Sequence, residues 1–113
     1  EVDIVLALSK FLAGDFEGAA EEIRQVRACI DKVAQAQGRK VHLKVILETG
    51  LLRTPENIAQ ASFLAMEAGA DFIKTSTGKV DVNATPAAAY VMCILQILVL
   101  GVRFALETIM RIL

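Results

Sequence analysis

The chain has 113 residues, a formal net charge of −1 at pH 7 and 22% charged residues. This length fits one ordinary domain, and the charge balance lacks the excess of lysine and arginine that is typical of nucleic-acid-binding proteins. The only histidine is His42, and the two cysteines, Cys29 and Cys93, form no CxxC motif. A metal site is therefore not expected, and reduced thiols in a cytoplasmic protein are the default interpretation.

The chain opens with an apolar strand pattern over residues 2–6, in which Asp3 is the only charged residue. Because successive side chains of a strand point to opposite faces, Asp3 and Val5 are predicted to share a face. The chain starts within this strand and without an initiator methionine, so we expect it to be a piece of a longer protein.

An amphipathic helix is predicted next, with Asp15 as its N-cap and its end near Gly38. Its apolar residues recur at the spacing of one helix face: Ile23, Val26, Ile30 and Val33.

The second strand pattern covers residues 41–50 and contains Lys44 among aliphatic residues. Alternation places Lys44, Ile46 and Glu48 on one face. The opposite face is apolar: Leu43, Val45 and Leu47.

A second helix is predicted from Thr54 to Gly69, since Thr54 is a good N-cap, Pro55 suits the first helical position and Glu56 favours the positive end of the helix dipole. The residues that it is predicted to bury are Ile58, Ala61, Leu64, Ala65 and Ala68.

The third strand pattern places Lys74 near the end of an apolar run that starts after Asp71, on the same face as Phe72 and Ser76. Burying an ammonium group is unfavourable unless something compensates. Lys74 is therefore either a reactive amine or an ordinary lysine that reaches water or an ion-pair partner. If the three strands align in one parallel sheet, Asp3, Lys44 and Lys74 can converge, and a carboxylate between two ammonium groups could move protons for one of them.

Thr85-Pro86 repeats the helix-start signal, so the order is strand, helix, strand, helix, strand, helix. This order predicts an α/β fold of three right-handed βα units with a parallel sheet, and it does not distinguish an open sheet from a piece of a barrel.

Four segments resemble the deoxyribose-phosphate aldolase family: Glu1-Val-Asp-Ile-Val5, Leu43-Lys-Val-Ile-Leu-Glu-Thr-Gly50, Gly69-Ala-Asp-Phe-Ile-Lys-Thr-Ser-Thr-Gly-Lys79 and Asn83-Ala-Thr-Pro86. The resemblance covers residues 1–93 and implies strands four to six of a (β/α)8 TIM barrel, here followed by a hydrophobic helical extension over residues 94–113 within one domain, 1–113. The family cleaves 2-deoxyribose 5-phosphate to glyceraldehyde 3-phosphate and acetaldehyde without a metal or cofactor.

The resemblance also implies residue roles. Lys74 would form the Schiff base, Asp3 would relay protons, and Lys44 would orient the hydroxyls of the substrate. Gly78 and Lys79 match part of the family's phosphate site. The family strands that supply a second lysine and most phosphate ligands are missing from this sequence, so we expect feeble activity at best.

The C-terminal segment departs from the family, because no charged residue occurs between Val82 and Val102 and the apolar residues surround most of the helix. A membrane span needs about 20 apolar residues, and the run over 87–102 is shorter and interrupted by Gln96. An intramolecular core helix is possible. An interface with another copy is preferred, together with pairing of open sheet edges. The predicted interface residues are Leu95, Leu98, Val99, Val102 and Ile109.

Two functions follow. The preferred one is a self-associating structural scaffold, an engineered or truncated aldolase piece with a relic Schiff-base lysine. The abrupt change of sequence near Cys93 suggests the engineering. The alternative is an active aldolase for a small phosphosugar, with a site that is completed by oligomerisation.

Overall fold

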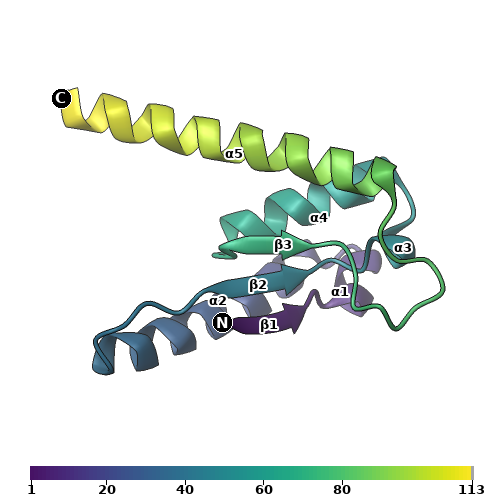
Figure 1. Ribbon diagram of the computed structural model, residues 1–113, viewed down its shortest axis with the longest axis horizontal. Coiled ribbons are helices and arrows are strands. Elements are labelled where there is room, and N and C mark those ends of the chain that lie inside the picture. Colours follow the sequence, from purple (N-terminus) through teal and green to yellow (C-terminus); the bar gives the residue numbers. More distant parts are fainter. Residues whose placement is uncertain (113) are drawn as a thin grey trace.

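The computed structural model describes residues 1–112, with side chains described as far as Val99. Figure 1 shows the three strands and five helices along the chain. In chain order these are β1 (Val2–Val5), α1 (Leu8–Leu12), α2 (Phe16–Ala36), β2 (Leu43–Ile46), α3 (Thr49–Leu52), α4 (Pro55–Glu67), β3 (Phe72–Lys74) and α5 (Pro86–Ile112).

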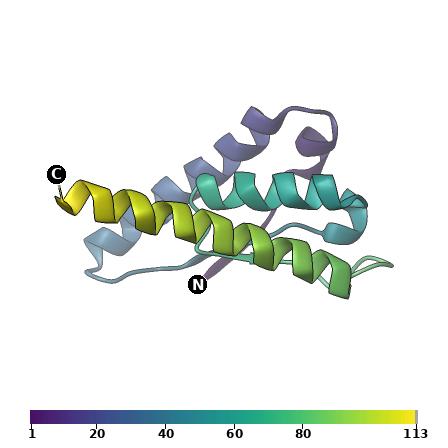
Figure 2. The same cartoon turned by 90° about the horizontal axis from the view of Figure 1, so that it is seen from above.

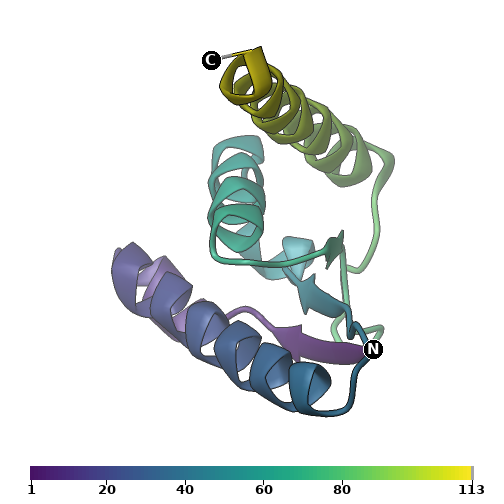
Figure 3. The same ribbon diagram turned by 90° about the vertical axis from the view of Figure 1, so that its left-hand side faces the viewer.

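The strands form one parallel sheet in the order β1-β2-β3, which confirms the predicted α/β fold. Asp3 pairs with Lys44, and Lys44 pairs with Phe72. Figure 3 shows the helices gathered on one side of the sheet, so the other face is uncovered. We call this uncovered side the open face.

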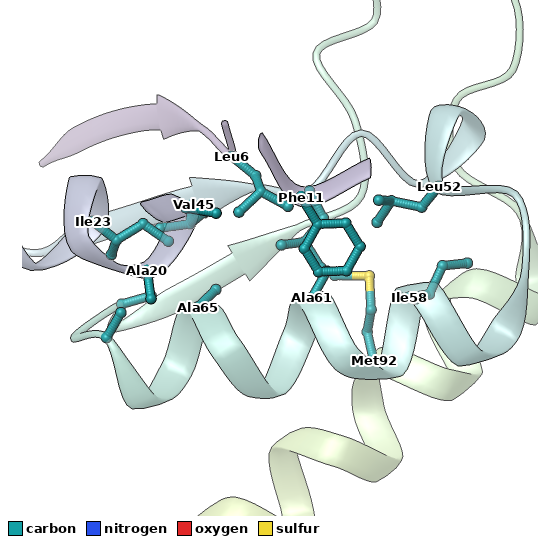
Figure 4. Packing of buried hydrophobic residues seen from close by; sticks show 14 of the residues in the cluster. Leu6, Phe11, Ala20, Ile23, Val45, Leu52, Ile58, Ala61, Ala65 and Met92 are labelled. Carbon is teal, nitrogen blue, oxygen red and sulfur yellow. The ribbon is translucent and has the colours of Figure 1, made fainter. Parts of the chain in front are cut away.

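The core lies between the sheet and its helices, where Leu43, Val45 and Leu47 are fully buried. Figure 4 shows Val45 close to Leu6, Ile23 and Phe11, with the small residues of α4 on the other side of this layer. The alternation predicted for β2 is thus the feature that separates core from open face.

The predicted helix starts are confirmed by their N-cap hydrogen bonds. The Asp15 carboxylate accepts from the Gly18 N–H at 2.9 Å, and the Thr54 hydroxyl accepts from the Asn57 N–H at 3.2 Å. Thr85 does the same for the Ala88 N–H at 3.1 Å. Each bond satisfies an amide that the helix itself leaves without a partner.

Three expectations about the elements were wrong. The strands are shorter than their apolar patterns, and the short helices α1 and α3 were not predicted. Val33, placed on the apolar face of α2, is 52% exposed, because the last turns of α2 extend beyond the sheet in Figure 1. Four to five residues carry too little periodicity to show a single helical turn in sequence.

The first part of α5 packs along α4, and Figure 2 shows the rest extending past the end of α4. Val99 is only 6% exposed and Leu95 is half-buried, whereas Leu98 is 57% exposed. Val99 was therefore wrongly assigned to an intermolecular interface, since it packs within the chain. The side chains of Val102 and Ile109 lie outside the described residues.

Within residues 1–112, none of the helices combines the length and hydropathy that crossing a membrane requires.

Candidate active site

The open face of the sheet carries the three residues predicted to be catalytic. Asp3 and Lys44 are directly paired in the register, and Lys74 pairs with Ile46, one row closer to the carboxyl ends of the strands. Because paired residues of parallel strands point to the same face, all three side chains share it. The prediction that they occupy one face is confirmed, with Lys74 one row away from the other two.

Lys44 has a partner that the sequence reasoning missed. Its Nζ donates a hydrogen bond to Glu1 Oε1 at 2.7 Å. This hydrogen bond raises the pKa of Lys44 above its usual value and outweighs partial desolvation, and the charge of Asp3 adds to the rise. In return, the hydrogen bond from Lys44 lowers the pKa of Glu1. Lys44 is therefore an ammonium group engaged with a carboxylate at neutral pH.

Glu1 could have been found from alternation, because it lies two residues before Asp3 and so belongs to the same face. Glu1 was not predicted to belong to the site, because it precedes the apolar pattern of the first strand.

Lys74 lies in water rather than in the interior. Lys74 is exposed, because β3 is an edge strand and no part of the chain that the structure describes covers the open face. Of the two alternatives left open for Lys74, this exposure favours the ordinary lysine that reaches water. Among the residues described, its amine forms no ion pair.

Gly78 and Lys79, which match part of the family's phosphate site by resemblance, have backbone amides that already donate within the chain. The Gly78 N–H donates to Asn83 Oδ1 at 3.0 Å, and the Lys79 N–H donates to Thr77 Oγ1 at 3.1 Å. Gly78 has a φ of +85°, which explains the glycine at this turn. An incoming phosphate would have to displace both of these acceptors.

Glu48 is the second residue that sequence reasoning missed. It was expected to continue β2 on the face of Lys44, but β2 ends at Ile46 and Glu48 adopts a left-handed conformation with φ 55°. Its carboxylate is buried and accepts from Thr77 N–H at 3.0 Å and from Thr77 Oγ1–H at 2.7 Å. Residue spacing does not indicate a single left-handed residue, so this turn could not be predicted from the apolar pattern.

Gly50, close to Glu48, allows the loop before α5 to approach. A Cβ at Gly50 would overlap the carbonyl oxygen of Val82. Residues 48–50 and the segment after β3 therefore form one packed unit at the carboxyl ends of the strands, the end at which barrel enzymes carry their chemistry.

The amino ends of the strands hold a separate cluster. The Asp71 carboxylate accepts from Arg27 Nη1 at 2.8 Å and from the Leu43 N–H at 2.9 Å. Partial burial opposes ionisation of Asp71, but the Leu43 amide and the charge of Arg27 prevail and lower its pKa.

The described residues contain no group of three His, Cys, Asp or Glu side chains arranged to hold a metal ion. Cys29 and Cys93 are both free and exposed.

Comparison with known proteins extends this description. The model of the DeoC/LacD family aldolases matches residues 2–97. The chain is 51% identical over 92 residues to the deoxyribose-phosphate aldolase of Agrobacterium fabrum, covering 81% of this chain and 33% of that protein. The human deoxyribose-phosphate aldolase is 50% identical over 93 residues, covering 81% and 26%.

A crystal structure from Toxoplasma gondii, assigned provisionally as a deoxyribose-phosphate aldolase, superposes with a TM-score of 0.71 at 24% identity. It covers 95% of this chain, which covers 38% of that structure.

The chain thus spans about a third or less of the curated relatives that it matches. Its three βα units correspond to part of a TIM barrel, as predicted. The family match continues to residue 97, so positions 94–97, expected to lie in the extension, are still similar to the family.

Proposed function

The chain belongs to the DeoC/LacD aldolase family, and we propose that it acts as a self-associating α/β scaffold that keeps the family's Schiff-base lysine position, Lys74, without a working site around it. The observation that carries this proposal is the apolar side of α5 that faces water. The exposure of Lys74 and the ion pair of Lys44 with Glu1 support the second half of the proposal, that no working site surrounds Lys74.

The exposed side of α5 is formed by Tyr90, Ile94, Ile97 and Leu98. Ile97 is 69% exposed and Leu98 is 57% exposed. Tyr90, Ile94 and Ile97 are separated by four and three residues, which aligns them along one side of the helix. Each buried Å² of apolar surface is worth about 25 cal/mol, so an apolar row of this kind favours association.

The sheet adds two further association sites. β1 and β3 are both edge strands, and neither is covered on its outer side by another strand of the chain. Uncovered edges present backbone groups to which another strand can bond. A second copy of the chain is the partner that we propose for these edges and for α5.

Light scattering coupled to size exclusion tests the scaffold. Ile97→Glu places a charge in the exposed row and should convert the assembly to monomer. Val33→Glu is the matched control, since Val33 is an aliphatic residue of similar exposure on α2, away from α5. A wild-type chain that elutes as a monomer, or an Ile97→Glu variant that assembles like the control, would contradict the proposal.

The second candidate is an active class I aldolase that cleaves 2-deoxyribose 5-phosphate. The shared face of Asp3, Lys44 and Lys74 favours it. Against it stand the ion pair of Lys44 with Glu1 and the internal use of the Gly78 and Lys79 amides. The scaffold is therefore the better supported function.

Trapping with acetaldehyde and borohydride separates the two candidates. The amine of a Schiff-base lysine condenses with acetaldehyde, losing water, and borohydride reduces the imine to a stable secondary amine. A stoichiometric adduct at Lys74, absent in Lys74→Ala, would favour the aldolase. Sparse modification spread over exposed lysines would favour the scaffold.

A cytoplasmic location stays a prediction, as does an engineered origin of the segment after the family match. A natural reading frame that continues past Cys93 with this sequence would contradict the engineered origin.

A further inference from the structure

Glu48 occupies a backbone conformation that is unfavourable for a glutamate. Its φ and ψ are 55° and 60°, in the left-handed region. Side chains with a Cβ rarely adopt this region, because the Cβ approaches the following carbonyl oxygen. Such an outlier persists when its surroundings determine it, and it is often found at functional sites.

The residues immediately before and after Glu48 both donate hydrogen bonds to the end of β3 and the residue that follows it. The Leu47 N–H donates to the Lys74 carbonyl and the Thr49 N–H donates to the Thr75 carbonyl, each at 2.8 Å. The left-handed turn at Glu48 lies between these two bonds. It directs the Glu48 side chain toward the residues that follow Lys74 rather than onto the open face.

Glu48 is 3% exposed, and each of its carboxylate oxygens accepts one hydrogen bond from Thr77. An ionised carboxylate only accepts, which matches the two donors, the amide and the hydroxyl of Thr77. The same Thr77 hydroxyl oxygen accepts from the Lys79 N–H at 3.1 Å. A continuous chain of hydrogen bonds therefore runs from Glu48 through Thr77 to Lys79.

We infer that Glu48 is a positioning residue that fixes residues 75–79, and through them the direction of Lys74 and the availability of the Gly78 and Lys79 amides to an anionic ligand. This inference rests on the proposed Schiff-base position of Lys74. Charge-assisted bonds to a buried carboxylate are stronger than those between neutral groups. Glu48 therefore determines how strongly residues 75–79 are held in place. It thereby determines how easily the Gly78 and Lys79 amides can leave their present acceptors.

Amide hydrogen exchange measured by NMR tests the inference on the chain as it is. Glu48→Gln keeps the size of the side chain but removes its charge: the amide oxygen can still accept from the Thr77 N–H, while the NH₂ group can only donate to the Thr77 hydroxyl, so both charge-assisted bonds to Thr77 are lost. Exchange at Thr77 and Lys79 should accelerate about tenfold, the effect of losing a hydrogen bond to a charged group. Glu56→Gln, a change of the same type at an exposed glutamate, should leave exchange at these residues unchanged.

Thr77→Val is the second variant, and it remains informative if Glu48→Gln fails to fold. It removes the hydroxyl that links Glu48 to Lys79, so exchange at Lys79 should accelerate. Thr77→Ser restores the hydroxyl and should return exchange at Lys79 to the wild-type rate, which a general loss of packing would not do.

Borohydride trapping then separates this inference from the proposed function. If the wild type forms an adduct at Lys74, its rate should change in Glu48→Gln and not in Glu56→Gln. If the wild type forms none, which is the outcome that the scaffold proposal predicts, the exchange data alone decide the role of Glu48. Wild-type exchange rates at Thr77 and Lys79 in both Glu48→Gln and Thr77→Val would overturn the inference.

Discussion

Two carboxylates hold the two ends of β3, and they bind different kinds of partner. At the amino end, Asp71 binds Arg27 of α2 and the first residue of β2, so it connects a strand, a helix and a second strand. At the carboxyl end, the Glu48 carboxylate accepts hydrogen bonds from Thr77, which is its one partner among the described residues and lies in the segment that follows β3. In barrel enzymes the amino ends of the strands serve stability and the carboxyl ends serve chemistry. In this chain the amino-end carboxylate connects three elements, whereas the carboxyl-end carboxylate holds a single segment.

The comparison predicts that Asp71 matters more for stability than any residue at the carboxyl end. In Asp71→Ala, Arg27 loses a partner although its side chain is only 17% exposed. A buried charge that loses every partner costs about 3–5 kcal/mol of unfolding free energy. Because Arg27 keeps Asp31 and the Val41 carbonyl as partners, while the Leu43 amide also loses its acceptor, we expect a smaller loss of about 2 kcal/mol. Urea unfolding measures the loss.

Asp31→Ala is the control for that experiment. Asp31 also pairs with Arg27, but its side chain is 62% exposed. Because exposed ion pairs contribute little, the control should lose less than about 0.5 kcal/mol. Equal losses in both variants would mean that the amino-end cluster is an ordinary surface pair.

Gly50→Ala tests the carboxyl end by sterics. The added methyl overlaps the Val82 carbonyl, so the loop before α5 has to move. Overpacking of this kind costs about 1–3 kcal/mol. We expect a loss near the lower limit, measured by urea unfolding, because an exposed loop can shift more easily than a strand. Gly101→Ala meets no atom within 4 Å and should not destabilise the chain.

The pH dependence of stability tests the carboxylate at the amino end of β3, and the expected effect is smaller than those of the substitutions above. The pKa of Asp71 is lowered in the folded chain by the Leu43 amide and by Arg27, against partial burial. A lowered pKa stabilises the fold above the unfolded value, about 3.9 for aspartate, and this contribution is lost as the pH falls through the folded pKa. Asp71→Asn should therefore have a shallower decline of stability below about pH 4 than the wild type. Parallel pH profiles, measured by urea unfolding at each pH, would contradict the assignment.

The helix starts and the faces of the strands were predictable because both follow from local spacing. Thr54, Thr85 and Asp15 cap helices in the structure as their positions in the sequence indicated. The common face of Asp3, Lys44 and Lys74 needed only alternation and a parallel sheet.

The surroundings of these residues were not predictable. The exposure of Lys74 depends on what covers the open face, and the use of the Gly78 amide depends on where Asn83 returns after the loop. The turn at Glu48 depends on backbone angles that an apolar pattern does not encode. Each of these is a property of partners distant in sequence or of the backbone, rather than of residue spacing.

The smallest expected effect concerns the open face. Glu1→Gln replaces the charged acceptor of Lys44, whose pKa the Glu1 hydrogen bond raises. The pKa of Lys44 should fall toward its usual value, as measured by the ¹³Cε chemical shift of that lysine against pH, with no measurable change in the urea midpoint. An exposed pair contributes little to stability because water already solvates both charges. If the pKa of Lys44 did not move, Asp3 rather than Glu1 would be the carboxylate that holds it, and the open face would be closer to the arrangement that an aldolase needs.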